Sequence, residues 1–309
     1  MDGAGRVAAI DCGTNSLRLL IADPMNGALH DVVRRMEIVR LGEGVDRTGR
    51  LAPAAIERAR RVLAEYTSSI AELGVRQVRM VATSASRDAE NADEFRAMVL
   101  STLGAEPEVV TGDEEARLSF VGAVRGLPST AAPPFLVVDI GGGSTEFVHG
   151  TGAVEQAISV DIGCVRMTER HLHGDPPTPE EITRAEADIA AGVDRAMAVV
   201  PAHGEGTLIG LAGSVTTVTA VALGLETYDP TLIHHARVSQ ADVARVTSEL
   251  LRMTRQERLA LPVMHPGRAD VIGAGALVLR VLMERIGCES VIASEHDILD
   301  GIAWSLVRS

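Results

Sequence analysis

Apolar and polar residues alternate near the N-terminus, and the spacing then becomes helical. The runs at residues 6–23 and 28–41 predict β-strands, and Asn26-Gly27 between them predicts a tight turn. From Pro53 to Leu73 the apolar residues recur near helical spacing, with Pro53 at the first position. This stretch therefore predicts an amphipathic helix.

Strand and helix patterns continue to alternate after this helix. We expect a short strand over 78–83, a helix over 88–103, and a further helix that follows Thr111 as a capping candidate. Alternation of this kind indicates an α/β layered fold.

The length of 309 residues suits two domains rather than one. Residues 126–134 are rich in Pro and Ala, and we expect them to connect a domain over 1–127 with a domain over 128–309. We leave open that the last helix packs back on the first domain. In the second domain we expect a strand that ends at Asp139, a helix capped by Thr178, and a strand at 208–211 whose glycine turn leads into a helix from about Val215.

A short pattern occurs twice, and its two copies are separated by 128 residues. Each copy is an apolar strand that ends in Asp, then a turn, then another strand, and at this offset Arg18 corresponds to Glu146. The copies read Ile10-Asp11-Cys12-Gly13-Thr14-Asn15-Ser16 and Val138-Asp139-Ile140-Gly141-Gly142-Gly143-Ser144. The repetition predicts two similar domains.

The repeated turns are candidate phosphate sites, because glycine lets backbone N–H groups approach an anion closely. The candidate phosphate-binding residues of the two copies are Gly141, Gly142, Gly143 and Ser144, and Thr14, Asn15 and Ser16. Asp11 and Asp139 at the strand ends are suited to hold a divalent cation, which we expect to be Mg²⁺. The alternative is that Asp-x-Gly serves only as hairpin turn chemistry.

Two further segments extend this candidate site. Glu146 should point to the same side of its strand as Ser144, so it could bind the metal, or else it is a solvent-facing carboxylate. Gly213 and Ser214 lie where a strand leads into a helix, and a helix N-terminus favours anions.

Candidate catalytic groups lie between the two copies. Arg87 should follow a strand end, where a guanidinium adds a bidentate fork for phosphate, although it could instead pair with Asp88 or Glu90. Glu114 and Glu115 fall in the first turn of a helix, where capping alone accounts for both. The functional alternative is that one of them is the general base for a water molecule that attacks a phosphoanhydride.

Composition excludes several functions. All 29 basic residues are Arg, so no lysine can serve in a Walker-type loop, a Schiff base or as a general base. The net charge of −13 argues against a nucleic-acid-binding protein. Residues 207–225 are uncharged but broken by glycine, which argues against a membrane span. Three widely spaced cysteines and the absence of a signal-peptide pattern favour a cytoplasmic protein, and Cys12 is expected to be a packed core residue.

Five motifs, in this order, resemble the signatures of the exopolyphosphatase and guanosine-pentaphosphate phosphohydrolase family over almost the whole chain. They are Asp11-Cys12-Gly13-Thr14-Asn15-Ser16-Leu17-Arg18-Leu19, Ala82-Thr83-Ser84-Ala85-Ser86-Arg87, Gly112-Asp113-Glu114-Glu115-Ala116-Arg117-Leu118, Asp139-Ile140-Gly141-Gly142-Gly143-Ser144-Thr145-Glu146 and Gly210-Leu211-Ala212-Gly213-Ser214. The resemblance implies two actin-like, ribonuclease-H-like domains that flank a cleft. It implies that Glu115 is the catalytic base, that Asp139 and Glu146 hold the metal, and that Arg87 and the Gly-Ser loop bind phosphate.

The chain departs from the family pattern in two places. Longer members continue into a C-terminal helical region, and this sequence stops where that region would begin, which puts processive handling of very long polyphosphate in doubt. The segment 294–301 lacks the commoner Arg-Glu pair, and its His296-Asp297 pair is read as incidental rather than as a metal site.

We therefore expect a Mg²⁺-dependent exopolyphosphatase that acts on short or medium chains, with a homodimer expected because a two-fold interface would extend the phosphate channel. The alternatives are hydrolysis of the terminal phosphate of guanosine pentaphosphate (pppGpp), an actin-like kinase, and a non-catalytic alarmone sensor. Neither nucleic acid nor a membrane is an expected partner.

Overall fold

The computed structural model describes residues 5–200 and 206–307. Chain contacts divide these residues into two compact units. Unit 1 contains the residues up to Gly122 and those from Ile298 onwards, and unit 2 is Ala123–Asp297. Unit 2 thus begins before the expected boundary at residue 128, and the last helix belongs to unit 1.

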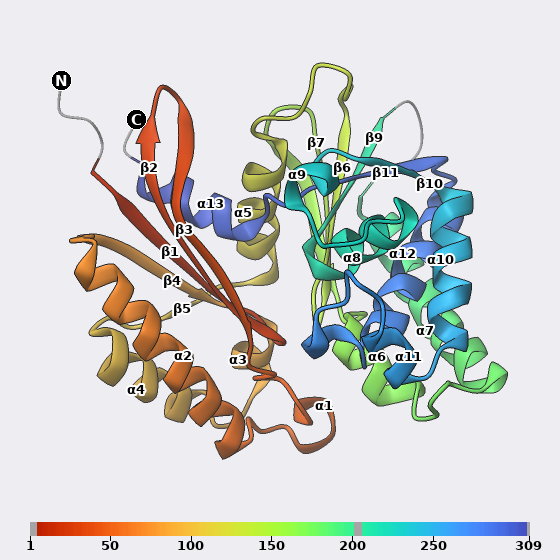
Figure 1. Cartoon of the computed structure of the whole chain (residues 1–309), viewed down its shortest axis with the longest axis horizontal. Coiled ribbons are helices and arrows are strands. Elements are labelled where there is room, and N and C mark those ends of the chain that lie inside the picture. The colour runs from red at the N-terminus through yellow and green to blue at the C-terminus, as the bar shows by residue number, and fades with distance from the viewer. Residues whose placement is uncertain (1–4, 201–205, 308–309) are drawn as a thin grey trace. The chain divides into compact units, whose positions relative to one another are not determined.

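Unit 1 is an α/β layer structure around one sheet (Figure 1). Its strands are β1 (Val7–Cys12), β2 (Ser16–Met25), β3 (Ala28–Ile38), β4 (Gln77–Ala82) and β5 (Glu108–Val109). Its helices are α1 (Val45–Thr48), α2 (Pro53–Glu72), α3 (Ser84–Asp88), α4 (Ala92–Leu103), α5 (Gly112–Val124), which runs on past the boundary, and α13 (Ile298–Leu306).

The sheet of unit 1 has the order β3-β2-β1-β4-β5, antiparallel from β3 to β1 and parallel from β1 to β5. Because side chains alternate along β1, Ala8, Ile10 and Cys12 pack against α2 and α4, whereas Val7 and Ala9 pack against α5 and α13. Cys12 is therefore a buried core residue, as expected. Asp11 shares the face of Val7 and Ala9, which is the face covered by α5.

Unit 2 contains a larger mixed sheet of order β10-β11-β9-β6-β7-β8. Its strands are β6 (Phe135–Ile140), β7 (Thr145–Gly150), β8 (Val154–Val160), β9 (Thr207–Leu211), β10 (Arg237–Ser239) and β11 (Ser290–Ala293). Its helices are α6 (Cys164–His171), α7 (Pro179–Met197), α8 (Ala212–Ala222), α9 (Pro230–Ile233), α10 (Gln240–Arg252), α11 (Arg255–Leu259) and α12 (Ile272–Ile286), with a 3₁₀ turn at Pro266–Arg268.

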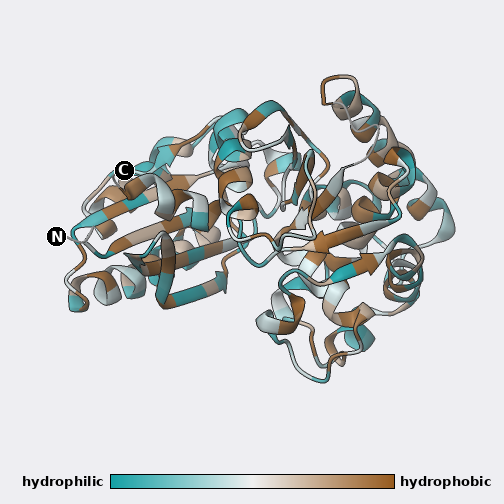
Figure 2. Cartoon of the chain, turned by 90° about the horizontal axis from the view of Figure 1, so that it is seen from above, coloured by the Kyte–Doolittle hydropathy of each residue, from teal (hydrophilic) through white to brown (hydrophobic). Residues whose placement is uncertain are grey.

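The core of unit 2 lies on one face of its sheet. Val138 and Ile140 of β6 and Phe147 of β7 pack there with aliphatic residues of α7 and α12. Coloured by hydropathy, the strands of the chain show mostly hydrophobic stretches in brown, interrupted by hydrophilic positions in teal (Figure 2). Asp139 and Glu146 alternate with the core residues and so point to the opposite face of the sheet.

Most elements expected from the pattern are present, which confirms the α/β fold class with two mixed sheets. Asn26 and Gly27 both have positive φ, as a tight hairpin turn requires. Thr178 forms a capping box with Glu181. No helix within residues 5–200 and 206–307 is both long enough and apolar enough to cross a membrane.

Two helix starts were predicted wrongly. The helix expected over 88–103 is α4, which begins only at Ala92, because Asp88 is the last residue of the separate short helix α3. Asn91 just before α4 accepts from the Leu51 amide at 2.8 Å, so a tertiary contact fixes the break between the helices. The helix expected from about Val215 begins at Ala212, so Gly213 and Ser214 lie in its first turn and not in a loop.

Candidate functional site

The hairpin β6–β7 brings two carboxylates together. Asp139 and Glu146 are directly opposite each other on the antiparallel strands, so their side chains share one face. They are only 7% and 1% exposed. Ser159, opposite Glu146 on β8, donates to Glu146 Oε1 at 2.7 Å. Two carboxylates on one face of a hairpin are candidate oxygen ligands for a divalent cation.

The corresponding position of unit 1 has an ion pair instead. Arg18 lies opposite Asp11 on β1–β2, and its Nε and Nη2 lie 2.8 and 2.7 Å from Asp11 Oδ2. A guanidinium thus supplies the positive charge that a metal was expected to supply at Asp11. The sequence expectation that Asp11 is a metal ligand therefore has weaker geometric support than the same expectation for Asp139 and Glu146.

The glycine loop (residues 141–144) is fixed through its carbonyl groups to the start of α6. The Cys164 amide donates to Gly141 O at 2.9 Å, and the Val165 amide donates to Gly142 O at 2.9 Å. Gly143 O accepts from the Gly163 amide at 3.2 Å. In a trans peptide the C=O and N–H groups point in opposite directions. The amides that follow these carbonyls, those of Gly142, Gly143 and Ser144, therefore point away from α6.

Gly163 is what allows this close approach. A Cβ atom at Gly163 would lie 2.3 Å from Gly142 O and 2.5 Å from the carbonyl carbon of Gly143. Only glycine lets the loop rest on the helix start at this distance. The loop consequently presents consecutive amide donors from a fixed backbone, which is the arrangement that binds phosphate oxygens.

The first-copy loop of unit 1 is held differently. Thr14 O accepts from the Gly42 amide at 2.8 Å, and Asn15 O accepts from the amides of Val39 and Arg40 at 3.0 and 2.9 Å. The Thr14 side chain is buried against Gly42, where a Cβ would lie 2.3 Å from the Thr14 methyl carbon. Asn15 and Ser16 are half-buried, and Ser16 begins β2.

The two adjacent glutamates of α5 have different surroundings. Glu114 is on the solvent side, 3.7 Å from Arg79 of β4. Glu115 is only 8% exposed, and its Oε2 lies 3.5 Å from Arg87 Nη1. Arg87 also donates to Val110 O at 3.1 Å, which fixes the guanidinium beside Glu115. Burial beside a cation distinguishes Glu115 as the candidate base.

Glu90, which was considered as an alternative partner of Arg87, lies 3.7 Å from Arg50. The side chain of Asp88, the other partner considered, is outside the described residues. The predicted placement of Arg87 after a strand end is confirmed, because α3 directly follows β4.

The start of α8 is the third candidate phosphate position, and it holds an arginine that the sequence pattern did not reveal. Ala212 has a φ of 66°, a strained value for a residue with a Cβ. At Gly213 a Cβ would lie 2.3 Å from Arg268 Cζ, so the Arg268 guanidinium rests on the first turn of α8. Arg268 also donates to Thr217 Oγ1 at 3.2 Å. A cation at a helix N-terminus, itself a region that favours anions, is suited to bind phosphate.

The Ser214 side chain is directed into the interior of unit 2. A Cβ at Gly275 would lie 2.2 Å from Ser214 Oγ, and Ser214 is hydrogen-bonded to the buried thiol of Cys164. Burial raises the pKa of Cys164. This placement joins α8, α6 and α12, so the Ser214 side chain packs in the interior of unit 2.

Comparison with known proteins identifies the family. The model of the Ppx/GppA phosphatase family matches residues 20–309. The chain belongs to the Ppx/GppA phosphatase family. It is 53% identical to Exopolyphosphatase 2 of Mycobacterium tuberculosis, over 97% of this chain and 98% of that protein. This confirms the resemblance drawn from the five motifs.

Two solved structures have a similar fold over 98% of this chain. One is an exopolyphosphatase-like protein with a TM-score of 0.95 and 45% identity, with 98% of each chain covered. The other is an exopolyphosphatase from Cytophaga hutchinsonii with a TM-score of 0.89 and 26% identity, with 98% of each chain covered.

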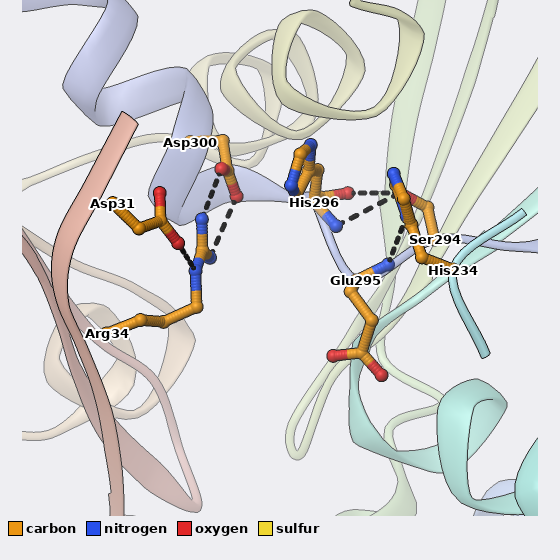
Figure 3. Close-up of polar contacts among 7 residues, drawn as sticks. All are labelled: Asp31, Arg34, His234, Ser294, Glu295, His296 and Asp300. Atoms are coloured by element: carbon orange, nitrogen blue, oxygen red, sulfur yellow. Dashed lines mark hydrogen bonds and ion pairs between the residues drawn. The ribbon is translucent and has the colours of Figure 1, made fainter. Parts of the chain in front are cut away.

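The segment that departs from the Ppx/GppA pattern makes its own contacts. In unit 1, Asp300 of α13 accepts from Arg34 Nη2 and Nη1 at 2.6 and 3.2 Å, and Asp31 also accepts from Arg34 (Figure 3). The Asp300 side chain is nearly buried, so this bidentate pair attaches α13 to β3. Asp300 thus has a structural role in unit 1.

His296 of the same segment lies in a group of histidines in unit 2. Its ring centroid is 4.4 Å from that of His234, which in turn is 3.6 Å from that of His235 (Figure 3 shows His234 and His296). The Glu295 amide donates to His234 Nδ1 at 3.2 Å. Among the residues that the structure describes, no group of three or more His, Cys, Asp or Glu side chains is arranged to hold a metal. The expectation that His296-Asp297 is incidental stays a prediction.

Proposed function

We propose that this member of the Ppx/GppA family is an exopolyphosphatase, which hydrolyses the terminal phosphoanhydride bond of inorganic polyphosphate. The β6–β7 hairpin carries the proposal. Its loop presents the amides of Gly142, Gly143 and Ser144, and its strands present the opposed carboxylates of Asp139 and Glu146. Phosphate donors and metal ligands on one hairpin are what a phosphoryl-transfer site requires.

The terminal phosphate would be bound by the amides of the glycine loop. Arg268 on the first turn of α8 adds a bidentate donor in the same unit. In unit 1 the proposed phosphate-binding residues are Arg87, which lies beside Glu115, and Thr14, Asn15 and Ser16. Donors held in place before the reaction stabilise the charge that spreads over the phosphoryl oxygens.

Glu115 is the proposed general base. Its carboxylate would orient a water molecule and accept its proton while the water oxygen bonds to the terminal phosphorus and the bridging P–O bond breaks. The products are orthophosphate and a chain shortened by one phosphate. A base of this kind contributes about 10²–10⁴-fold to the rate.

We infer that Asp139 and Glu146 hold Mg²⁺, with Asp11 left as a weaker candidate ligand because Arg18 neutralises it. Buried carboxylates are the oxygen ligands that this cation prefers, and it usually keeps several waters. When bound, Mg²⁺ would neutralise negative charge on the phosphate oxygens.

The relatives support polyphosphate as the substrate, since the protein from M. tuberculosis is named Exopolyphosphatase 2 and covers nearly the same length. The same residues would also accept the terminal phosphate of pppGpp, which is the alternative substrate. Two further proposals, on oligomeric state and on location in the cell, follow from the sequence. The protein is expected to be a homodimer, and the free thiols of Cys12, Cys164 and Cys288 are consistent with the cytoplasm.

Orthophosphate release tests the proposal. The purified protein would be assayed with Mg²⁺ on tripolyphosphate, on polyphosphate of increasing length and on pppGpp. We expect a higher kcat/KM for a polyphosphate than for pppGpp. A higher kcat/KM for pppGpp would reassign the substrate, and transfer to an acceptor without orthophosphate release would indicate a kinase. Binding of pppGpp without turnover of any substrate would indicate a sensor.

A further inference from the structure

Arg166 contacts the glycine loop from the side opposite to its amides. Its Nε donates to Gly143 O at 2.7 Å, and its backbone amide donates to Gly142 O at 3.1 Å. The side chain is 15% exposed and lies 3.7 Å from the exposed carboxylate of Asp161. Arg166 thus binds two consecutive peptide groups of the loop, one through its side chain and one through its backbone.

The hydrogen bond to Gly143 O acts on one particular peptide group. The carbonyl of Gly143 and the amide of Ser144 belong to the same planar unit, so fixing one fixes the direction of the other. The donor is a guanidinium, which makes this bond shorter and stronger than one between neutral groups. Hydrogen bonds in a chain polarise one another, so a cation on the carbonyl strengthens the amide as a donor.

The fold does not depend on this bond alone. Gly143 O also accepts from the Gly163 amide, and the carbonyls of Gly141 and Gly142 accept from amides at the start of α6. Removal of the Arg166 side chain would therefore leave the loop seated on α6. The substitution would remove the positive charge next to Gly143 O and the side-chain hydrogen bond that orients the Gly143–Ser144 peptide.

We propose that Arg166 is a positioning residue, which holds the Gly143–Ser144 peptide so that the Ser144 amide donates to the terminal phosphate. The inference rests on the proposed function, because that function places phosphate at the loop. Arg166 itself lies on the carbonyl side of the loop and acts through the peptide.

The test compares Arg166→Met with a matched control on the same helix. Arg170 lies one turn later on α6, is exposed and pairs with Asp188 at 3.6 Å, so Arg170→Met removes the same charge without touching the loop. Two assays are used. The first is the hydrolysis of tripolyphosphate, and the second is a titration with inorganic phosphate that is followed by the chemical shift of the Ser144 amide. Melting temperature without ligand reports the fold.

We expect Arg166→Met to raise the KM for tripolyphosphate and the Kd for inorganic phosphate about ten-fold, which corresponds to loss of a charge-assisted hydrogen bond. Its melting temperature should match that of Arg170→Met, and Arg166→Lys, which keeps a charged donor, should recover part of the affinity. Equal KM and Kd values for the two Met variants would overturn the inference. So would a loss of affinity that accompanies a fall in melting temperature and is not recovered by Arg166→Lys.

The two proposals fail in different ways. A wild-type protein that hydrolyses no polyphosphate would contradict the proposed function. The phosphate titration needs no turnover, so it still decides the role of Arg166. If phosphate leaves the Ser144 amide shift of the wild-type protein unchanged, the positioning role is wrong even where hydrolysis is observed.

Discussion

Glu146 lies directly opposite Asp139 across β6 and β7, both nearly buried. At the equivalent place in unit 1, Arg18 lies opposite Asp11 and neutralises it. The two halves of the duplicated pattern therefore differ in charge. Asp11 is paired with the guanidinium of Arg18, whereas Mg²⁺ is the cation that we propose for Asp139 and Glu146.

The first prediction concerns that cation. In the wild-type protein Mg²⁺ should raise the melting temperature, because a ligand at 100 times its Kd stabilises the folded state by about 2.7 kcal/mol. Glu146→Gln should abolish this rise and the activity. Without Mg²⁺ the variant should be as stable as the wild type or more so, since the like-charge repulsion of roughly 0.2–1 kcal/mol is gone.

Thermal melts with Mg²⁺ and with EDTA check this prediction. The control is Glu155→Gln, which changes a half-exposed glutamate on the neighbouring strand β8. It should melt like the wild-type protein under both conditions. A Glu146→Gln variant that kept the full Mg²⁺-dependent rise would show that the cation binds elsewhere.

The second prediction concerns the contact between the glycine loop and Gly163 at the start of α6. Gly163→Ala places a Cβ 2.3 Å from Gly142 O, so the loop has to move. A displacement near 1 Å in a phosphate-binding group lowers kcat/KM on the order of 10²-fold. Gly152→Ala is the matched control, because a Cβ there meets no heavy atom within 4 Å. If both variants hydrolyse tripolyphosphate at the wild-type rate, the loop does not bind the reacting phosphate.

The third prediction is a pH dependence of stability in unit 2. Burial lowers the pKa of His235 from its ordinary value, and the charge of His296 lowers it further. The unfolded chain therefore binds more protons than the folded protein as the pH falls below about 6.5, so acid reduces stability. His235→Asn removes this effect, and asparagine tolerates the positive φ of 66° at this position.

Denaturant unfolding at pH 7.5 and 5.5 measures the effect. The loss of stability between these values should be smaller in His235→Asn than in the wild-type protein. The exposed residue His30 supplies the control, and His30→Asn should lose as much stability as the wild type. An equal loss in all three proteins would mean that His235 does not titrate differently on folding.

Local patterns were sufficient to predict the duplicated hairpin and most of the helices and strands that we expected from the sequence. Alternation gave the strand faces, and turn and cap residues such as Asn26, Gly27 and Thr178 act through neighbours close in sequence. The break between α3 and α4 was missed because it depends on Asn91 and Leu51, which are 40 residues apart.

The chemical site was harder to predict, since its geometry depends on contacts between distant segments. Spacing could not separate Glu114 from Glu115, and it was the family resemblance that selected Glu115; the structure separates them by their contacts with Arg79 and Arg87. Arg166 and Arg268 were missed for the same reason. Arg166 is 23 residues from Gly143, and Arg268 is 51 residues from Thr217.

The central claim is that this protein hydrolyses phosphoanhydride bonds with Glu115 as the base. The most direct test is orthophosphate release from tripolyphosphate with Mg²⁺ by the wild type, Glu115→Gln and Glu114→Gln. Glu114 is the matched control, since it is the adjacent residue in the same helical turn but lies near Arg79 at the surface. We predict that kcat falls about 10²–10⁴-fold in Glu115→Gln and stays within about three-fold of wild type in Glu114→Gln. Full activity in Glu115→Gln, with the same melting temperature as the wild type, would contradict the account.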